Sequence, residues 1–256
     1  MAIMTNLTIR GILFDKDGTL IDFPSTWTPV LKALALEFAR GDCARADDLM
    51  ATAGYDPDSG RFKPGSIWAA GNTLDLVTAW LPEAPDGERA DVARWVDEYC
   101  ERIAPDTAVP VTDLVRFFGG LRQSGLALGV ATNDGTRSAL ATMQRFGVAD
   151  LLTAVLGYDS VARPKPAADM VVAFCAEAAI EPGEVAVVGD NLHDLVMARA
   201  AGAALAIGVL TGNGTRDDLG AYADHIIDSI EDLPRLLQTL ETSAPAAPAA
   251  LAALAR

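Results

Sequence analysis

The chain has 256 residues, half of them hydrophobic, and its 20 lysines and arginines are outnumbered by 35 aspartates and glutamates. The formal charge of −15 would repel the phosphate backbone of a nucleic acid over most of the surface, so nucleic-acid binding is not expected. No stretch approaches the about 20 apolar residues that a membrane helix needs, and the N-terminus lacks the pattern of a secretion signal. We therefore expect a cytoplasmic protein without a membrane partner, either a monomer or a homodimer.

Four short apolar runs, each ending at a turn, have the pattern of buried strands. They cover residues 8–14, 126–132, 184–189 and 203–209, and a possible last strand begins at His225. Between them, apolar residues recur with helical spacing over 114–121, and a helix is predicted over 167–178, directly after Pro166. Strands that alternate with helices imply a Rossmann-like α/β core, in which helices cover both faces of a parallel sheet.

The stretch from 23 to 110 interrupts this alternation, because it offers helical patterns and no convincing strand. Helices are predicted over 30–39 and 67–80, and a third apolar stripe runs from Val92 to Ile103. We interpret 23–110 as a helical cap inserted into a core made of 1–22 and 111–242, followed by a flexible Ala/Pro-rich tail, 243–256. The insert follows the first strand directly, so it can cover the sheet edge where open α/β proteins bind ligands.

Six polar residues fall at or just beyond the carboxyl ends of predicted strands. They are Asp15, Asp17, Thr132, Lys165, Asp190 and Asp194. Each of them alone would be read as a turn former, a helix cap or a solvated loop residue. Together they place carboxylates, a hydroxyl and an ammonium from four distant segments on the same edge of the sheet, which predicts one functional site.

These segments resemble the motifs of the haloacid dehalogenase superfamily of phosphohydrolases, and of phosphoglycolate phosphatases in particular. The four matching segments, in chain order, are Asp15-Lys16-Asp17-Gly18-Thr19-Leu20, Thr132-Asn133, Arg163-Pro164-Lys165-Pro166 and Gly189-Asp190-Asn191-Leu192-His193-Asp194. The resemblance spans roughly residues 9–212, and the insert matches the helical cap of that family in position and size. It implies the fold of that family and a phosphatase that works through an aspartyl-phosphate.

The resemblance also assigns roles to these residues. Asp15 would be the nucleophile, and Asp17 would donate a proton to the leaving group and later take one from water. Asp15, the Asp17 carbonyl, Asp190 and Asp194 would hold Mg²⁺, because clustered carboxylates repel a phosphate unless a cation intervenes. Lys165 would neutralise Asp15 and the phosphate, and Thr132 with Asn133 would hydrogen-bond the phosphoryl oxygens.

Lys16 departs from the apolar residue often found between the two aspartates of these phosphatases; it either tunes the metal site or points to solvent, and we expect the latter. In the insert, a turn-rich loop at 54–65 carries Arg61 and Lys63, one of which we expect to contact an anionic part of the substrate; a solvated surface loop is the alternative. His193 is expected at the surface, and Asp22 as a hinge or cap residue.

The expected substrate is a small phosphorylated metabolite, with phosphoglycolate as the first candidate. A phosphosugar mutase is the alternative within the same chemistry, because it too passes through an aspartyl-phosphate. A non-enzymatic phospho-acceptor module is a more distant alternative. Response-regulator receiver domains are modules of this kind. They combine an acceptor aspartate with an acidic pair, a threonine and a lysine, but in a different order along the chain.

Overall fold

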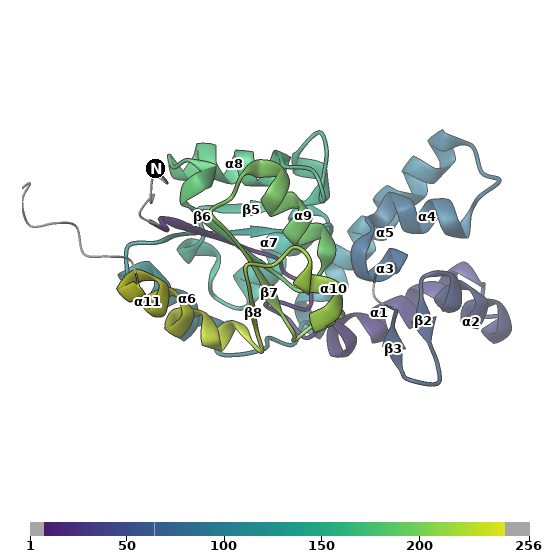
Figure 1. Cartoon of the computed structure of the whole chain (residues 1–256). Coiled ribbons are helices and arrows are strands. Elements are labelled where there is room, and N and C mark those ends of the chain that lie inside the picture. The colour runs from purple at the N-terminus through teal and green to yellow at the C-terminus, as the bar shows by residue number, and fades with distance from the viewer. Residues whose placement is uncertain (1–7, 64, 244–256) are drawn as a thin grey trace, which may run out of the picture.

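The computed structural model describes residues 8–63 and 65–243, and its centre is a parallel sheet of six strands (Figure 1). In spatial order the strands are β5 (Ala154–Leu156), β4 (Ala127–Ala131), β1 (Gly11–Phe14), β6 (Val185–Gly189), β7 (Leu205–Val209) and β8 (His225–Ile227). The strand β1 lies in the middle, with Ile12 paired to Leu128 on one side and to Ala186 on the other. The α/β fold class predicted from the sequence is confirmed.

Helices cover both faces of the sheet (Figure 1). On one face lie α6 (Leu114–Gln123), α7 (Thr136–Arg145) and α11 (Leu233–Ser243); on the other lie α8 (Asp169–Ala178), α9 (Leu192–Ala201) and α10 (Arg216–Gly220). Short 3-10 turns occur at Ala149–Leu151, Tyr158–Ser160, Pro182–Glu184 and Ile230–Asp232. The alternation of side chains along β1 serves both cores, because Ile12 and Phe14 pack on the first face and Leu13 on the second.

Residues 23–107, from the start of α1 to the end of α5, form a second body beside the carboxyl ends of the strands, which we call the cap (Figure 1). It contains α1 (Phe23–Phe38), α2 (Cys43–Thr52), α3 (Ile67–Ala70), α4 (Thr73–Trp80), α5 (Asp86–Thr107) and a hairpin of β2 (Tyr55–Asp56) and β3 (Arg61–Phe62). Its apolar side chains, among them Leu34, Trp80 and Val96, form a hydrophobic cluster of their own. The exact domain boundaries given above stay a prediction.

Several sequence expectations are refined by the structure. The four main strands are confirmed with shorter bounds, and His225 begins β8 as expected. The expectation of a strand-free insert is wrong, because β2 and β3 pair there, and the helix predicted over 67–80 is broken into α3 and α4. The break follows from Asn72, whose side chain accepts a hydrogen bond from Asp75 N–H and so caps α4.

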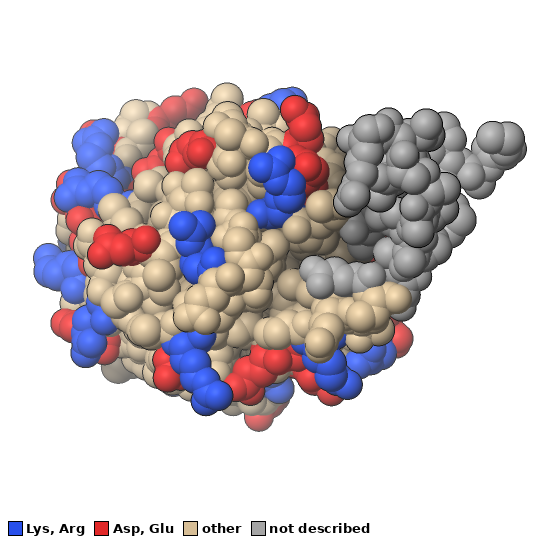
Figure 2. All heavy atoms as spheres, turned by 90° about the vertical axis from the view of Figure 1, so that its left-hand side faces the viewer, with Lys and Arg blue, Asp and Glu red and all other residues tan. Residues whose placement is uncertain are grey.

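The first turn of the cap begins as expected at Asp22, whose carboxylate accepts a hydrogen bond from the backbone of Ser25 and caps α1. The tail predicted over 243–256 lies, except for Ser243, outside the described residues. Within the described residues, no helix combines the length and apolar character that crossing a membrane requires. On the face turned away from the cap, basic and acidic side chains are interspersed, so neither sign of charge dominates its visible part (Figure 2).

Candidate active site

Three neighbouring strands deliver the predicted site residues to one edge of the sheet. Asp15 follows β1, Thr132 follows β4 and Asp190 follows β6, and these strands lie side by side in the order β4, β1, β6. Because parallel strands end at the same edge, residues that are 175 positions apart in sequence meet here. Asp194 joins them from the first turn of α9, where its carboxylate accepts a hydrogen bond from Asn191 N–H.

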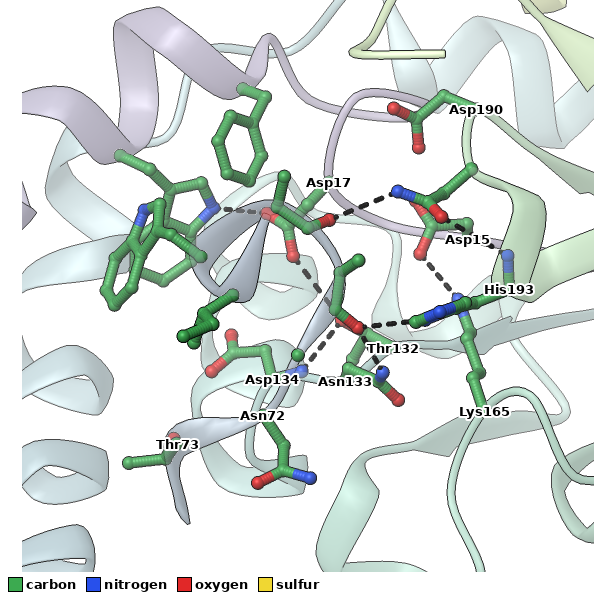
Figure 3. A pocket seen from close by; sticks show the side chains of 18 of the residues that line it. Asp15, Asp17, Asn72, Thr73, Thr132, Asn133, Asp134, Lys165, Asp190 and His193 are labelled. Carbon is green, nitrogen blue, oxygen red and sulfur yellow. Dashed lines mark hydrogen bonds and ion pairs between the residues drawn. The ribbon is translucent and has the colours of Figure 1, made fainter. Parts of the chain in front are cut away.

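Asp15, Asp190 and Asp194 form a buried carboxylate cluster, with one oxygen from each lying within 4.8 Å of the others. The Lys165 ammonium lies 2.6 Å from Asp15 Oδ1 and 2.6 Å from Asp194 Oδ1 (Figure 3). All four residues are at most 8% exposed. A buried cluster of three carboxylates thus contains one ammonium, which pairs with two of them.

This imbalance of charge shows in the proton affinities. Burial, reinforced by the neighbouring carboxylates of Asp194 and Asp17, raises the pKa of Asp15 from 3.8 to about 7 although Lys165 opposes the shift. Burial together with Asp15 and Asp194 also raises the pKa of Asp190 well above its usual value. For Lys165, burial alone would lower the pKa, but the two carboxylates overcome it and raise the pKa. The cluster is therefore short of positive charge.

Gly18 and Gly212 lie so close to the Asp190 side chain that only glycine fits at either position. Asn213 N–H donates to Asp190 Oδ2 at 2.8 Å. A Cβ atom on Gly18 would lie 2.5 Å from Asp190 Oδ2, and one on Gly212 would lie 1.9 Å from it. Gly18 also has a φ of +88°, which L side chains rarely adopt. These contacts fix the Asp190 carboxylate toward the cluster.

Asp17 lies beside the cluster and connects the core to the cap (Figure 3). Its carboxylate accepts hydrogen bonds from Thr132 Oγ1 at 3.3 Å and from the indole N–H of Trp27, which belongs to α1. The prediction that Lys16 points to solvent is wrong: its side chain is fully buried, with the ammonium 2.8 Å from Asp17 and 3.1 Å from Asp134. The ring of Trp27 covers it, with the ammonium 4.8 Å from the ring centroid.

A short segment of the cap, residues 67–73, also lies over this edge. The carbonyl oxygen of Ala70 accepts a hydrogen bond from Asn133 Nδ2 at 2.8 Å and lies 3.1 Å from His193 Nδ1. Asn191 Nδ2 lies 3.5 Å from the Ala69 carbonyl. Between cap and core remains a cavity of about 80 Å³, and all the site residues predicted in the core line it, Thr132 and Asn133 included.

Arg61 and Lys63 lie elsewhere. They line a second cleft of about 400 Å³ between the β2–β3 hairpin and residues 210–215, and they are not among the described residues that line the cavity at Asp15. The structure thus brings together Asp15, Asp17, Thr132, Asn133, Lys165, Asp190 and Asp194 but leaves out the two cap cations. A role for Arg61 or Lys63 in substrate contact stays a prediction.

Comparison with known proteins agrees with this geometry. Residues 9–202 match the family model of the haloacid dehalogenase-like hydrolases. The chain belongs to this family. The family and the enzyme class predicted from the motifs are confirmed.

Curated relatives of this hydrolase carry phosphatase names. The chain is 32% identical to "Probable phosphatase IndB" of Dickeya dadantii, covering 84% of this chain and 87% of the relative. It is 27% identical to N-acetylmuramic acid 6-phosphate phosphatase of Pseudomonas aeruginosa, over 91% and 99%. It is 30% identical to phosphoglycolate phosphatase of Chromobacterium violaceum, over 90% and 97%.

The fold itself is shared with solved structures. A crystal structure described as a predicted phosphoglycolate phosphatase of Haemophilus somnus 129pt superimposes with a TM-score of 0.68 at 21% identity, covering 92% of this chain and all of that one. At this identity the likeness concerns the fold.

The sequence did not reveal several residues of the site. Asp134, Trp27 and Trp68 line the cavity, and so does His193, which is half-buried rather than at the surface. Asp134 follows Thr132 and Asn133 at the end of a strand, so its position was the one available signal. The tryptophans lie on cap helices, and only the tertiary packing of the cap brings them to the core.

Proposed function

We propose that this hydrolase is an Mg²⁺-dependent phosphatase that cleaves a small phosphomonoester through an aspartyl-phosphate on Asp15. The observation that carries the proposal is the buried cluster of Asp15, Asp190 and Asp194, in which the single ammonium of Lys165 pairs with Asp15 and Asp194 only. A phosphoryl group is itself an anion, so such a cluster can receive it only together with a cation.

The residues fit a magnesium ion. The three carboxylates supply hard oxygen ligands, which Mg²⁺ prefers, and Asp15 Oδ2 is buried without a hydrogen-bond partner among the described residues. We assign Asp15, Asp190, Asp194 and the backbone carbonyl of Asp17 to the ion. When bound, Mg²⁺ would neutralise the carboxylates and the phosphoryl oxygens that face them.

In the first step, a carboxylate oxygen of Asp15 attacks the phosphorus atom, and the bond from phosphorus to the leaving oxygen breaks. Asp17 delivers its proton to that oxygen, so the leaving group departs as a neutral hydroxyl. Lys165 stays beside Asp15 and offsets negative charge as the acyl phosphate forms, while Thr132 and Asn133 donate hydrogen bonds to the phosphoryl oxygens.

In the second step, water attacks the phosphorus of the acyl phosphate. Asp17, now ionised, accepts a proton from this water, and the bond between phosphorus and Asp15 breaks. Phosphate leaves, and both aspartates return to their first state. The hydrogen bond from the Trp27 indole holds the Asp17 carboxylate in place for both transfers.

A phosphorylated metabolite is the proposed substrate, and the names of two relatives support this choice, since both are phosphatases of phosphorylated carboxylic acids. Phosphoglycolate therefore remains the reference compound for a first survey.

The proposal is tested by phosphate release from a panel of small phosphoesters, with and without Mg²⁺, using wild type and Asp15→Asn. We expect release that requires both the metal and Asp15. Release that persists in Asp15→Asn would contradict the proposed chemistry. No net release, together with a requirement for a bisphosphate activator, would point to the mutase instead.

A further inference from the structure

The side of the cavity that receives the leaving group can be located from the proposed function. Asp17 must contact the leaving oxygen in order to protonate it. Asp17 accepts a hydrogen bond from the indole N–H of Trp27. The ring of Trp68 packs edge-on against that of Trp27, with the ring centroids 5.6 Å apart and an interplanar angle of 84°. The leaving group therefore lies against the cap, along this pair of tryptophans.

The cap contributes an uncharged wall to the cavity. Its lining residues from the described part of the chain include Phe23, Trp27, Ile67, Trp68, Val96 and Cys100. None of the cap residues that line the cavity in this part of the chain is a lysine, an arginine or an acid. A carboxylate on the leaving group would have no cation to pair with on this side, and burying an unpaired carboxylate is costly.

The cations of the core are already engaged. Lys165 is the only lysine or arginine among the described residues that line the cavity, and it bridges Asp15 and Asp194. Lys16 is fully buried between Asp17 and Asp134. His193 Nδ1 lies 3.1 Å from the Ala70 carbonyl oxygen. Because a carbonyl oxygen can only accept, Nδ1 carries the hydrogen and donates it to the cap.

Two residues that line the cavity, Trp68 from the cap and Asn133 from the core, nevertheless carry neutral polar atoms without a hydrogen-bond partner among the described residues. The indole N–H of Trp68 is buried without a partner among the described residues, and so is the side-chain oxygen of Asn133, whose amide nitrogen binds the cap. One is a donor and the other an acceptor, and a hydroxyl group can satisfy both kinds of partner. Aromatic rings beside them suit the C–H faces of a hydroxylated carbon chain.

We propose that the leaving group is an uncharged polyol or small sugar, whose carbon chain packs on Trp68 and whose hydroxyls bind Trp68 Nε1 and Asn133 Oδ1. This inference rests on the proposed phosphatase function and narrows its substrate class. It predicts a lower kcat/KM for phosphoglycolate and other phosphorylated acids than for neutral analogues of the same size.

A matched pair of substrates tests the proposal. Glycerol 3-phosphate and 3-phosphoglycerate share a carbon skeleton and differ by a hydroxymethyl group in place of a carboxylate. We expect kcat/KM for glycerol 3-phosphate to be higher by about tenfold or more, because the carboxylate loses its hydration without gaining a partner. Trp68→Phe keeps an aromatic ring but removes the five-membered ring that carries the N–H, and we expect it to lower kcat/KM for glycerol 3-phosphate by about tenfold. Trp95→Phe, at a cap tryptophan outside the cavity lining, is the matched control.

The outcomes separate this inference from the proposed function. Asp15- and Mg²⁺-dependent release with 3-phosphoglycerate preferred would overturn the neutral leaving group and leave the phosphatase standing. If His193→Gln abolished that preference, His193 would be the cation that binds the acid. If Trp68→Phe lowered kcat/KM for glycerol 3-phosphate no more than Trp95→Phe does, the proposed hydrogen bond to Trp68 Nε1 would be overturned. Absence of release from every compound would overturn the proposed function, and this inference with it.

Discussion

The Lys16 ammonium holds two carboxylates, Asp17 and Asp134, in the wall of the active site. Burial alone would lower the pKa of Lys16, but the two carboxylates overcome it and raise the pKa, so this side chain stays charged. Asp134 is held in turn by Ser138 Oγ at 2.9 Å. Lys16 therefore links the first motif to α7 and fixes the orientation of the proposed acid and base, Asp17.

Replacing Lys16 by methionine keeps the volume of the side chain and removes its charge. We expect Lys16→Met to lower the free energy of unfolding by about 3–5 kcal/mol, because Asp17 and Asp134 are left without their shared cation. Denaturant unfolding measures the effect. Lys32→Met, at an exposed cap lysine, is the matched control. A loss no larger than that of Lys32→Met would show that the buried pair contributes nothing.

At the scale of elements, α5 packs against α7 and joins the cap to the core. Asp97 of α5 accepts hydrogen bonds from Thr73 Oγ1 at 2.5 Å, in the cap, and from Tyr158 Oη at 2.6 Å, in the core. Burial, with the negative charges of Asp134 and Asp159, raises the pKa of Asp97 against the effect of these hydrogen bonds. The ionised form is thus disfavoured in the folded protein.

This shift predicts a pH dependence of stability. A raised pKa means that the folded state binds the proton more tightly than the unfolded state. The stability of wild type relative to Asp97→Asn should therefore rise as pH falls from neutral through the folded pKa toward the ordinary value of 3.8, and then level off. Unfolding of both proteins across this range measures the difference. A difference that fell with decreasing pH would contradict the shift.

Some elements and site residues could be predicted from the sequence and others could not, and the difference has physical reasons. Apolar runs of β1, β4, β6 and β7 end at turns, so both their existence and their edge could be predicted, and with them the positions of Asp15, Thr132 and Asp190. β5, with three residues, is too short for a periodic signal. The surroundings of Lys16 and Trp68 depend on partners far away in sequence, which no local pattern conveys.

At the scale of the whole molecule, a formal charge of −15 repels an anionic substrate before it arrives. Arg61 and Lys63 are exposed and have no ion pair within 4.0 Å among the described residues. They line a cleft beside residues 212–213, which pack on Asp190. Their position suits attraction of the substrate at a distance.

Removing the charges of Arg61 and Lys63 distinguishes long-range attraction of the substrate from direct contact with it. We expect Arg61→Ala/Lys63→Ala to lower kcat/KM several-fold at low ionic strength, and we expect the loss to fade at high salt, where charges are screened beyond about 3 Å at 1 M. Arg116→Ala/Arg145→Ala removes the same charge from exposed positions on α6 and α7, outside the lining of both clefts. A loss that persists at high salt would instead support direct contact with the substrate.

The phosphorylation of Asp15 is the centre of this account, and it can be measured directly. Wild type turning over the best substrate of the panel with Mg²⁺ would be quenched in acid, and the mass of the peptide that contains Asp15 would be determined. We predict that this peptide gains one phosphoryl group, that Asp17→Asn changes the fraction labelled, and that Asp15→Asn carries no label there. If wild type released phosphate while the label was absent or lay on another residue, the proposed phosphorylation of Asp15 would be contradicted.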